Sequence, residues 1–223
     1  MAHVRTPSPV LRGPLPARIL ACVVGCAAFG WGIAAMIGSH AGLAPWDVFH
    51  FGLAEHTGTS FGIAGALVGF LIGAVAWALG RAPGWSTLVN IVVVTPSADL
   101  FLRLHVVPDL AGWSLAPRLL ENVAGIVVIG LGSGLYIGAG RTAGPRDSLM
   151  LAVTDRTGLR VALSRNAQEL AALIVGTALG GAAHGRLGIG TLLFALGIGP
   201  AVEAGFWLVN RSPLALRPVT EPG

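Results

Sequence analysis

Six ionisable side chains lie in or beside the apolar stretches of this sequence, and they are the residues best suited to bind a solute or an ion. They fall into three pairs: Asp47 with Asp147, Asp99 with Glu203, and Arg165 with Glu169. An ionisable group inside a membrane is costly, and by default it marks a substrate or ion pathway. We therefore predict that these six residues line such a pathway, and we assign no catalytic residue and no metal ligand.

The first pair belongs to a short motif that occurs twice. Pro45-Trp46-Asp47 is followed by Thr57-Gly58, and Pro145-Arg146-Asp147 is followed by Thr157-Gly158, each at an offset of 100 residues. Proline suits the first position of a helix, and an early carboxylate suits the exposed amide groups there. Each motif therefore predicts a short helix that begins at its proline.

Two placements of these short helices remain open. In the first, each helix lies at the membrane interface, with Trp46, Phe49 and Leu53 on one face. In the second, each is a re-entrant half-helix, and the two N-termini approach the middle of the membrane from opposite sides. We prefer the interfacial placement, because only six residues separate Gly38 from Pro45, which is short for a descent into the membrane.

Asp99 and Glu203 each follow a proline by three residues, at an offset of 104. Both therefore lie in predicted membrane spans, next to a residue that distorts a helix. For Asp99, an ion pair with Arg103 or a position at the membrane surface competes with a role in transport. Both explanations stay open.

Arg165 and Glu169 are four residues apart, so they either pair on one helical face or form part of a solute site. Their surroundings differ most between the two halves of the chain. The apolar stretch Ala64, Gly65, Ala66, Val68 and Gly69 becomes Ser164, Arg165, Asn166, Gln168 and Glu169. A substrate site needs such an asymmetry, which favours a functional role.

The composition indicates an integral membrane protein. The chain is 54% hydrophobic and only 11% charged, whereas a soluble domain carries about 25% charged residues; its mean hydropathy is +0.76. Six apolar stretches are long enough to span a bilayer as helices, at 18–39, 61–80, 84–104, 118–140, 164–182 and 188–209. The chain lacks a phosphate-cradling glycine loop and a His-Glu-x-x-His sequence, so we expect no enzyme and no cofactor.

The repetition of the motif extends over most of the chain. Thr87 and Pro96 recur as Thr191 and Pro200 at an offset of 104. Each copy holds three predicted spans, and an odd number forces the copies into opposite orientations. We predict an all-α membrane protein with six transmembrane helices in two inverted three-helix repeats, 18–105 and 118–209, flanked by a disordered cytoplasmic tail, 1–17, and a C-terminal tail, 210–223.

The arginines predict the orientation. All fourteen basic residues are arginine, and with a cytoplasmic N-terminus eleven lie inside and three lie outside, as the positive-inside rule requires. We therefore place the protein in the plasma (inner) membrane with both termini cytoplasmic, the Asp47 loop outside and the Asp147 loop inside. His50 is among the histidines expected in outer loops. The pI of about 10.4 then reflects topology, and no nucleic-acid partner is expected.

Several stretches resemble the YczE-type bacterial integral membrane proteins, an uncharacterised family. They are Gly42 to Asp47, Gly52-Leu53, Thr57-Gly58, Gly144 to Asp147, Arg165 to Glu169, and Gly188 to Thr191 continuing through Gly199-Pro200. The resemblance covers nearly the whole chain after the N-terminal tail. The family pattern often has a glycine before the third-span proline, where this chain has Thr95. The resemblance implies a family and no specific activity.

The repeat and the polar fifth span predict a small secondary transporter or exporter of an unknown small solute or ion. Two alternatives remain: a non-transporting membrane partner or regulator, in which the repeat only builds a bundle, and a channel, which re-entrant segments would favour. A homo-oligomer is compatible with each of them. Whether Asp47 and Asp147 share one cavity with Glu169 decides between the placements of the short helices.

Overall fold

The computed structural model describes residues 9–140, 142, 144–159 and 161–212, apart from the side chains of 161–163, 165 and 166. The described part is helical, with eight α-helices in the order α1 Leu15–Ser39, α2 Pro45–Thr57, α3 Phe61–Ala78, α4 Trp85–Arg103, α5 Leu115–Gly140, α6 Pro145–Thr157, α7 Val161–Ala178 and α8 Ile189–Arg211. The predicted all-α class is confirmed. The helices of the second half begin 100 to 104 residues after their counterparts in the first half.

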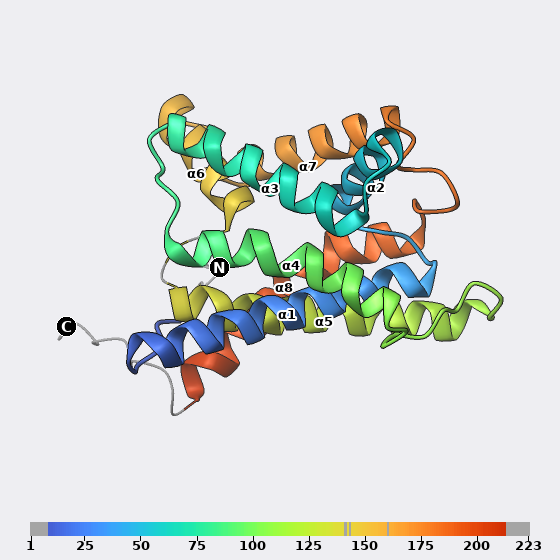
Figure 1. Ribbon diagram of the computed structural model, residues 1–223, viewed down its shortest axis with the longest axis horizontal. Coiled ribbons are helices and arrows are strands. Elements are labelled where there is room, and N and C mark those ends of the chain that lie inside the picture. Colours follow the sequence, from blue (N-terminus) through green and yellow to red (C-terminus); the bar gives the residue numbers. More distant parts are fainter. Residues whose placement is uncertain (1–8, 141, 143, 160, 213–223) are drawn as a thin grey trace, which may run out of the picture.

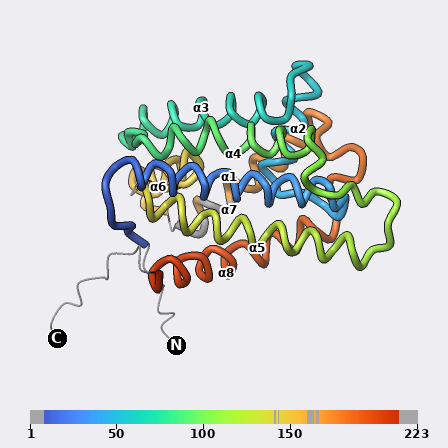
Figure 2. Tube along the Cα trace, turned by 60° about the horizontal axis from the view of Figure 1, so that its bottom comes forward, coloured from blue at the N-terminus to red at the C-terminus, as the bar shows by residue number. Residues whose placement is uncertain are grey.

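The helices form two layers (Figure 1). One layer holds α1 and α5 side by side, with α4 packed against α1 and α8 packed against α5. The other layer holds α3 and α7 with the short helices α2 and α6, which lie at opposite ends of the molecule (Figures 1 and 2). The first turn of α1 and the last turn of α8 lie at the same end as α6.

Helices α1 and α5 approach each other more closely than side chains would permit. A Cβ atom added to Gly25 would lie 2.8 Å from the carbonyl oxygen of Gly132, and one added to Gly32 would lie 2.5 Å from that of Gly125. Small residues let helix backbones meet in this way inside membranes. The pair α1 and α5 is thus the central contact of the first layer.

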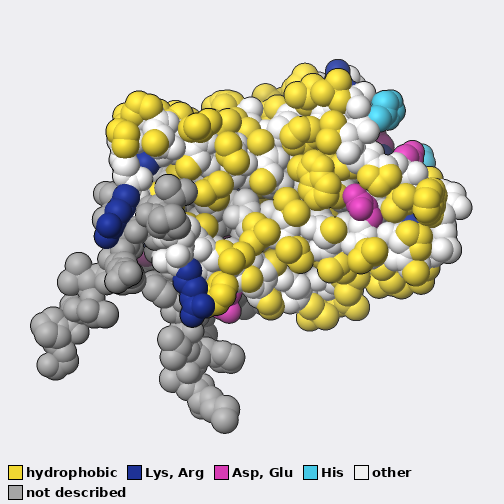
Figure 3. Space-filling model, turned by 90° about the horizontal axis from the view of Figure 1, so that it is seen from below, with side chains coloured by type: hydrophobic (Ala, Val, Ile, Leu, Met, Phe, Trp, Pro, Cys, Tyr) yellow, Lys and Arg dark blue, Asp and Glu magenta, His cyan; other side chains and the backbone are white. Residues whose placement is uncertain are grey.

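Five of the described helices, α1, α3, α4, α5 and α8, are long and apolar enough to cross a membrane. The sixth predicted span, 164–182, is not among them; within the described residues the apolar part of α7 is Ala167–Ala178. On the face shown in Figure 3, charged side chains lie mainly near the two ends and the middle is largely apolar. Such a belt fits a bilayer.

Helices α2 and α6 begin at Pro45 and Pro145, as predicted, and end where Gly58 and Gly158 adopt left-handed φ angles of 68° and 69°. Helix α2 is enclosed by the protein, because its buried residues lie on both of its faces and it packs on α3 and α7. In the linker before α2, Gly42 has a φ of 129°, a backbone conformation that favours glycine, and an added Cβ atom would lie 2.8 Å from the backbone nitrogen of Thr191.

Candidate functional site

A cavity of about 140 Å³ lies between the two layers, and each of the eight described helices contributes to its wall. Its polar lining comes from α2, α4, α5, α6 and α7, whereas α1, α3 and α8 contribute mainly apolar side chains and glycines. The polar side chains are Trp46, His50, Asn90, Thr95, Ser133, Tyr136, Arg146, Asp147, Gln168 and Glu169. Among the predicted residues, Asp147 and Glu169 therefore share one cavity.

The N-terminal ends of α2 and α6 meet at this cavity. The guanidinium carbon of Arg146 lies 4.8 Å from the centre of the Trp46 ring, within the range of a cation–π contact. Its Nη2 atom lies 3.5 Å from Nε2 of His50. Trp46 and Arg146 occupy the same place in the two motifs. The short helices are thus directed inward from opposite ends of the molecule, as in the re-entrant alternative.

Asp47 and His50 form a buried pair beside Arg146. Their side chains are each 2% exposed, and Asp47 Oδ1 lies 3.6 Å from His50 Nδ1, too far for a hydrogen bond. Neither atom has a hydrogen-bond partner within the described part of the chain. Arg146 and Glu169 are the charged groups that act on Asp47. Three of the five predicted acids, Asp47, Asp147 and Glu169, thus belong to one charged centre.

Helices α3 and α4 close one border of the cavity. A Cβ atom added to Gly65 would lie 2.5 Å from the Thr95 side chain, and one added to Gly62 would lie 2.8 Å from Asp99 Cβ. Thr95 also donates a hydrogen bond from Oγ1 to the carbonyl oxygen of Gly62, at 3.2 Å. The first turns of α3 therefore fit tightly against the last turns of α4, at the end of the molecule that carries α2.

Helices α7 and α8 form the matching border at the other end, and within the described residues they barely touch. The positions of α7 equivalent to Gly62 and Gly65 hold Ala162 and Arg165. On α8, a Cβ atom added to Gly199 would meet nothing within 4 Å, and Glu203 is exposed. The two borders of the cavity thus differ: one is tightly packed and the other is not.

The sequence matches the family of unknown function DUF6198 over residues 16–205. The chain belongs to this family. It is 36% identical over 160 residues to the uncharacterized membrane protein YczE of Bacillus subtilis, covering 71% of each chain. It is also 30% identical over 184 residues to an uncharacterized protein of Haemophilus influenzae, covering 82% of this chain and 81% of the relative. No solved structure matches it.

The relatives confirm the resemblance that the motifs indicated, and with the apolar helices they support a membrane location for this DUF6198 protein. The paired Pro-x-Asp motifs lie within the part of the chain that defines the family match. The charged centre at the meeting of α2 and α6 is therefore a feature of the matched region. The relatives carry no assigned activity, so the site must be interpreted from its own chemistry.

The remaining predicted residues of this DUF6198 protein lie outside the cavity or outside the described part. Asp99 pairs with Arg103 at 3.0 Å and lines a separate depression between α3 and α4, which supports the structural explanation. Glu203 faces outward on α8. The Arg165 side chain is not among those described, so its predicted pairing with Glu169 stays a prediction.

Arg146 and His50 line the cavity, although neither is among the site residues predicted from the sequence. The prediction of loops gave no reason to expect these two residues side by side. The first turns of α2 and α6 meet at the cavity and bring them together. One signal was present in the sequence: Trp46 and Arg146 are the mismatched residues inside an otherwise repeated Pro-x-Asp motif.

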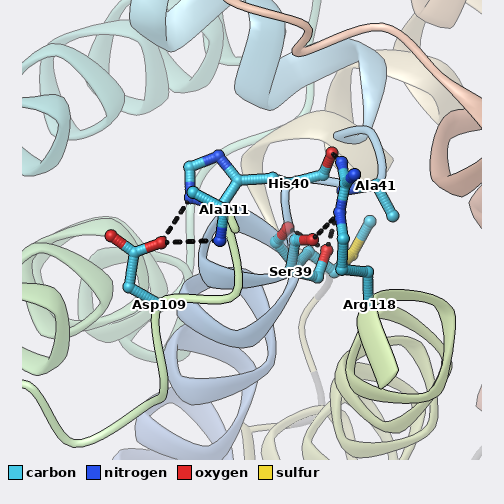
Figure 4. A network of polar contacts seen from close by, with 7 residues as sticks. Ser39, His40, Ala41, Asp109, Ala111 and Arg118 are labelled. Atoms are coloured by element: carbon cyan, nitrogen blue, oxygen red, sulfur yellow. Dashed lines mark hydrogen bonds and ion pairs between the residues drawn. The ribbon is translucent and has the colours of Figure 1, made fainter. Parts of the chain in front are cut away.

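A polar network holds the linker that turns the chain from α1 into α2 (Figure 4). Arg118 donates from Nε to the carbonyl oxygen of Ser39, at 3.0 Å, and from Nη2 to that of His40. His40 contacts Asp109 at 2.7 Å. The backbone amide of Ala111 and the contact with His40 lower the pKa of Asp109. The linker is thereby tied to the start of α5 and to the loop before it.

The other end of the protein uses a matching contact. Arg18, which is 100 residues before Arg118, donates from Nε to the carbonyl oxygen of Ala139 at 2.9 Å.

Two ion pairs hold the C-terminal ends of the short helices. Arg186 pairs with Glu55 of α2 at 2.6 Å, and Arg81 pairs with Asp155 of α6 at 2.6 Å. The hydrogen bond from Arg186 lowers the pKa of Glu55. Glu55 and Asp155 lie in the last turns of α2 and α6, so the two ion pairs connect the C-terminal ends of the short helices to neighbouring segments.

Proposed function

We propose that this DUF6198 protein is a small secondary transporter or exporter of the plasma membrane, working by alternating access. The observation that carries the proposal is the charged cavity at the meeting of the α2 and α6 N-termini. One border of this cavity, α3 with α4, is tightly packed, while its counterpart, α7 with α8, shows little contact within the described residues. A protein that alternates between two sides needs such a pair of unequal borders around one site.

The architecture supports two inverted three-helix halves. In that arrangement α7 crosses the membrane as the fifth of six spans, and α2 and α6 are re-entrant half-helices of opposite direction. The packing follows this correspondence, since α2 packs on α7 as α6 packs on α3. With both termini in the cytoplasm, the loosely packed border of α7 and α8 would face the cytoplasm, because it lies at the end that carries α6.

The charged centre also argues against a purely structural bundle. Burying charged groups in a membrane protein is expensive, and they are seldom kept for packing alone. Asp47 and His50 are buried with an oxygen and a nitrogen that have no hydrogen-bond partner in the described part. A channel would require a continuous path, and the tight contact of α3 with α4 interrupts one. The transporter is therefore the function that the geometry supports best.

Thiol labelling tests this proposal without a known substrate. Cys22 and Cys26 are both buried, so a background with both changed to alanine gives a chain free of reactive thiols. Single cysteines replace Val94 on α4 and Val202 on α8, which both line the cavity. A control cysteine replaces Leu120, an exposed apolar residue of α5.

In membrane vesicles of both orientations, we expect Val202→Cys to react with an impermeant thiol reagent from one side, and Val94→Cys to react from the other side in a smaller fraction of molecules. Leu120→Cys should stay unreactive. Simultaneous reaction of one position from both sides would indicate a channel. Complete protection of both positions under all conditions would indicate a non-transporting protein.

A further inference from the structure

We propose that the depression between α3 and α4 binds one membrane phospholipid with a primary ammonium headgroup, a phosphatidylethanolamine. Its acyl chain lies along the apolar side chains of the two helices, and its headgroup lies at Asp99 and Arg103. This surface is separate from the charged cavity, so the inference goes beyond the proposed transport function and does not depend on it. The shape of the depression, its polar end and the charges at that end each point to this ligand.

The depression has the length of one leaflet of a bilayer. Its volume is about 450 Å³, and its lining runs along one side of α3 from Ser60 to Phe70 and along one side of α4 from Pro96 to Arg103. Ser60 and Phe70 are ten positions apart, which corresponds to about 15 Å of helix. Half of the hydrocarbon core of a bilayer also measures about 15 Å. A groove of this length accommodates one acyl chain.

The wall of the depression is apolar over most of its length. Ile63, Leu67 and Phe70 of α3 and Leu100 of α4 line it, and each of these side chains is about half exposed. Ala66 lies between them on α3 and is small, which leaves space between the larger side chains. On the outer face of two membrane helices, an open apolar groove of this kind meets lipid chains.

Polar groups gather at one end of the depression. Ser60, Asp99 and Arg103 lie there, where α3 begins and α4 ends. Ser60 Oγ accepts a hydrogen bond from the backbone amide of Ile63 at 3.3 Å, and its own hydroxyl proton can be donated to a ligand. A groove that is polar at its end and apolar along its length matches a molecule built in the same way, as a phospholipid is.

The two charged groups at this end can each bind a further ionic partner. Arg103 Nη2 lies 3.0 Å from Asp99 Oδ2, and this contact uses one atom of each group. A guanidinium has five N–H donors, and a carboxylate accepts at both of its oxygens. The Arg103 side chain is 66% exposed, so its other donors can reach a phosphate. Asp99 Oδ1 can accept from an ammonium.

The charges select among lipid headgroups. In a phosphatidylethanolamine the phosphate contacts Arg103 and the ammonium contacts Asp99, so both contacts are charge-assisted hydrogen bonds and the complex is neutral. An anionic phosphatidylglycerol would bring its phosphate to Arg103 but would add a negative charge beside Asp99. A phosphatidylcholine carries a positive charge but has no N–H group to donate to the carboxylate. The ethanolamine headgroup is therefore the one that satisfies both side chains.

The bound lipid would lie over the packed border of α3 and α4. Gly62 lines the depression, and a Cβ atom added to it would lie 2.8 Å from Asp99 Cβ and 3.0 Å from Pro96 Cα. The headgroup would bridge the helices beside this close approach, because Ser60 precedes α3 and Arg103 ends α4. With both termini in the cytoplasm, this end of the protein faces the outer leaflet.

Native mass spectrometry of the purified full-length protein in detergent tests the inference. The probes are three phospholipids with identical acyl chains and ethanolamine, glycerol or choline headgroups. We expect one phosphatidylethanolamine per protein, bound about tenfold more tightly than the other two lipids, the scale of one charge-assisted hydrogen bond. Arg103→Met should weaken this binding by about tenfold, and Arg103→Lys should retain most of it. Asp99→Asn should lower the preference for ethanolamine and strengthen the binding of phosphatidylglycerol.

Matched variants test the position of the lipid. Leu67→Trp fills the depression and should weaken all three lipids, whereas Leu71→Trp, at an exposed position of the same helix outside the depression, should not. Arg81→Met is the control for charge, since Arg81 also pairs with an aspartate, Asp155, but at the end that carries α6. It should leave lipid binding unchanged.

Three outcomes would contradict the proposal. Equal affinity for the three lipids in the unmodified protein, or ethanolamine binding that survives Arg103→Met, would overturn the headgroup assignment. Lipid binding that is unaffected by Leu67→Trp would place the lipid elsewhere. A dimer that forms without added lipid and is lost in Leu67→Trp would show that a second copy of the chain covers the depression instead.

Discussion

Helices α3 and α4 occupy positions in the sequence equivalent to those of α7 and α8, but the two pairs pack differently. Helices α3 and α4 are in close contact, whereas α7 and α8 barely touch within the described residues. Gly62, Gly65 and Gly69 form a stripe on α3 that lets α4 approach to backbone distance. The equivalent positions on α7 hold Ala162, Arg165 and Glu169. Glycine is the residue that permits the closest approach of two helices, and α7, which lacks these glycines, barely touches α8 within the described residues.

The comparison also shows where the polarity of the site comes from. Glu169 replaces the last glycine of the stripe and lines the cavity, so one change both loosens the border and adds a charge. Arg146 replaces Trp46 at the start of the short helix and brings the compensating charge. Two halves with similar motifs thus form an asymmetric site through differences at single positions, without an additional helix.

The largest effect on stability is expected from removing the Arg146 guanidinium, because the equivalent position of the first motif holds the uncharged Trp46. Arg146→Met leaves the acids around Asp47 without their guanidinium, and we expect a loss of about 3 kcal/mol in the free energy of unfolding, as for a buried charge left without its partner. Denaturant titration in detergent micelles measures it. The control is Arg103→Met, since the Arg103 side chain is 66% exposed and its loss should be hardly detectable. Equal effects would show that Arg146 is not part of a buried centre.

The second prediction addresses the two borders directly. Gly65→Ala places a methyl group 2.5 Å from Thr95 and should destabilise the protein by about 1 to 3 kcal/mol through overpacking. Gly199→Ala at the loose border meets no atom, and it should stabilise α8 by about 0.5 to 1 kcal/mol through helix propensity. Thermal unfolding compares the two variants. A destabilising Gly199→Ala would mean that α7 and α8 pack as α3 and α4 do.

The third prediction concerns the linker before α2. Asn122, fully buried, donates to Ser39 Oγ at 3.2 Å and to the carbonyl oxygen of Gly42 at 2.9 Å. Its counterpart in the first half is Cys22, which has no amide group to donate such hydrogen bonds. Asn122→Ala should cost about 1 to 2 kcal/mol of unfolding free energy, because buried acceptors lose their donor. Cys22→Ala serves as the control, with hydrogen exchange of the 40–44 amides as a second readout.

The smallest effects are expected for the two ion pairs at the far ends of α2 and α6. The Arg186 side chain is only 17% exposed and also stacks on Phe51 at 4.1 Å, whereas the Arg81 side chain is 45% exposed. Arg81→Ala should change the free energy of unfolding by less than about 0.5 kcal/mol, and the effect should vanish at high salt. Arg186→Ala should have the larger effect, which unfolding at low and high salt can resolve.

Lowering the pH should weaken the ion pair between Arg186 and Glu55, because Glu55 becomes protonated. The folded-state pKa of Glu55 lies below its usual value, so the pair contributes stability at neutral pH and loses it as the pH falls below about 4. Arg186→Ala should remove this acid-dependent part of the stability curve. An unchanged pH dependence in that variant would show that other carboxylates dominate the acid transition.

Several features of the fold could be predicted because they depend on short stretches of chain. The start of α2 at Pro45 and its end before Gly58 follow from the fixed φ of proline and the left-handed freedom of glycine, and both are confirmed. Three of the six predicted site residues, Asp47, Asp147 and Glu169, belong to one charged centre. Asp99 does not, because a partner one helical turn away, Arg103, satisfies it.

The sequence by itself determined that this is a helical membrane protein, that its motif is repeated, and where the halves diverge, because composition, spacing and local backbone preference suffice for those conclusions. Only the tertiary structure decided that α2 and α6 point inward, that Arg146 stacks on Trp46, and that α3 and α4 pack closely while α7 and α8 barely touch within the described residues. These features depend on contacts between separate helices, such as that of Trp46 on α2 with Arg146 on α6, and such contacts follow from the packing of all eight described helices together.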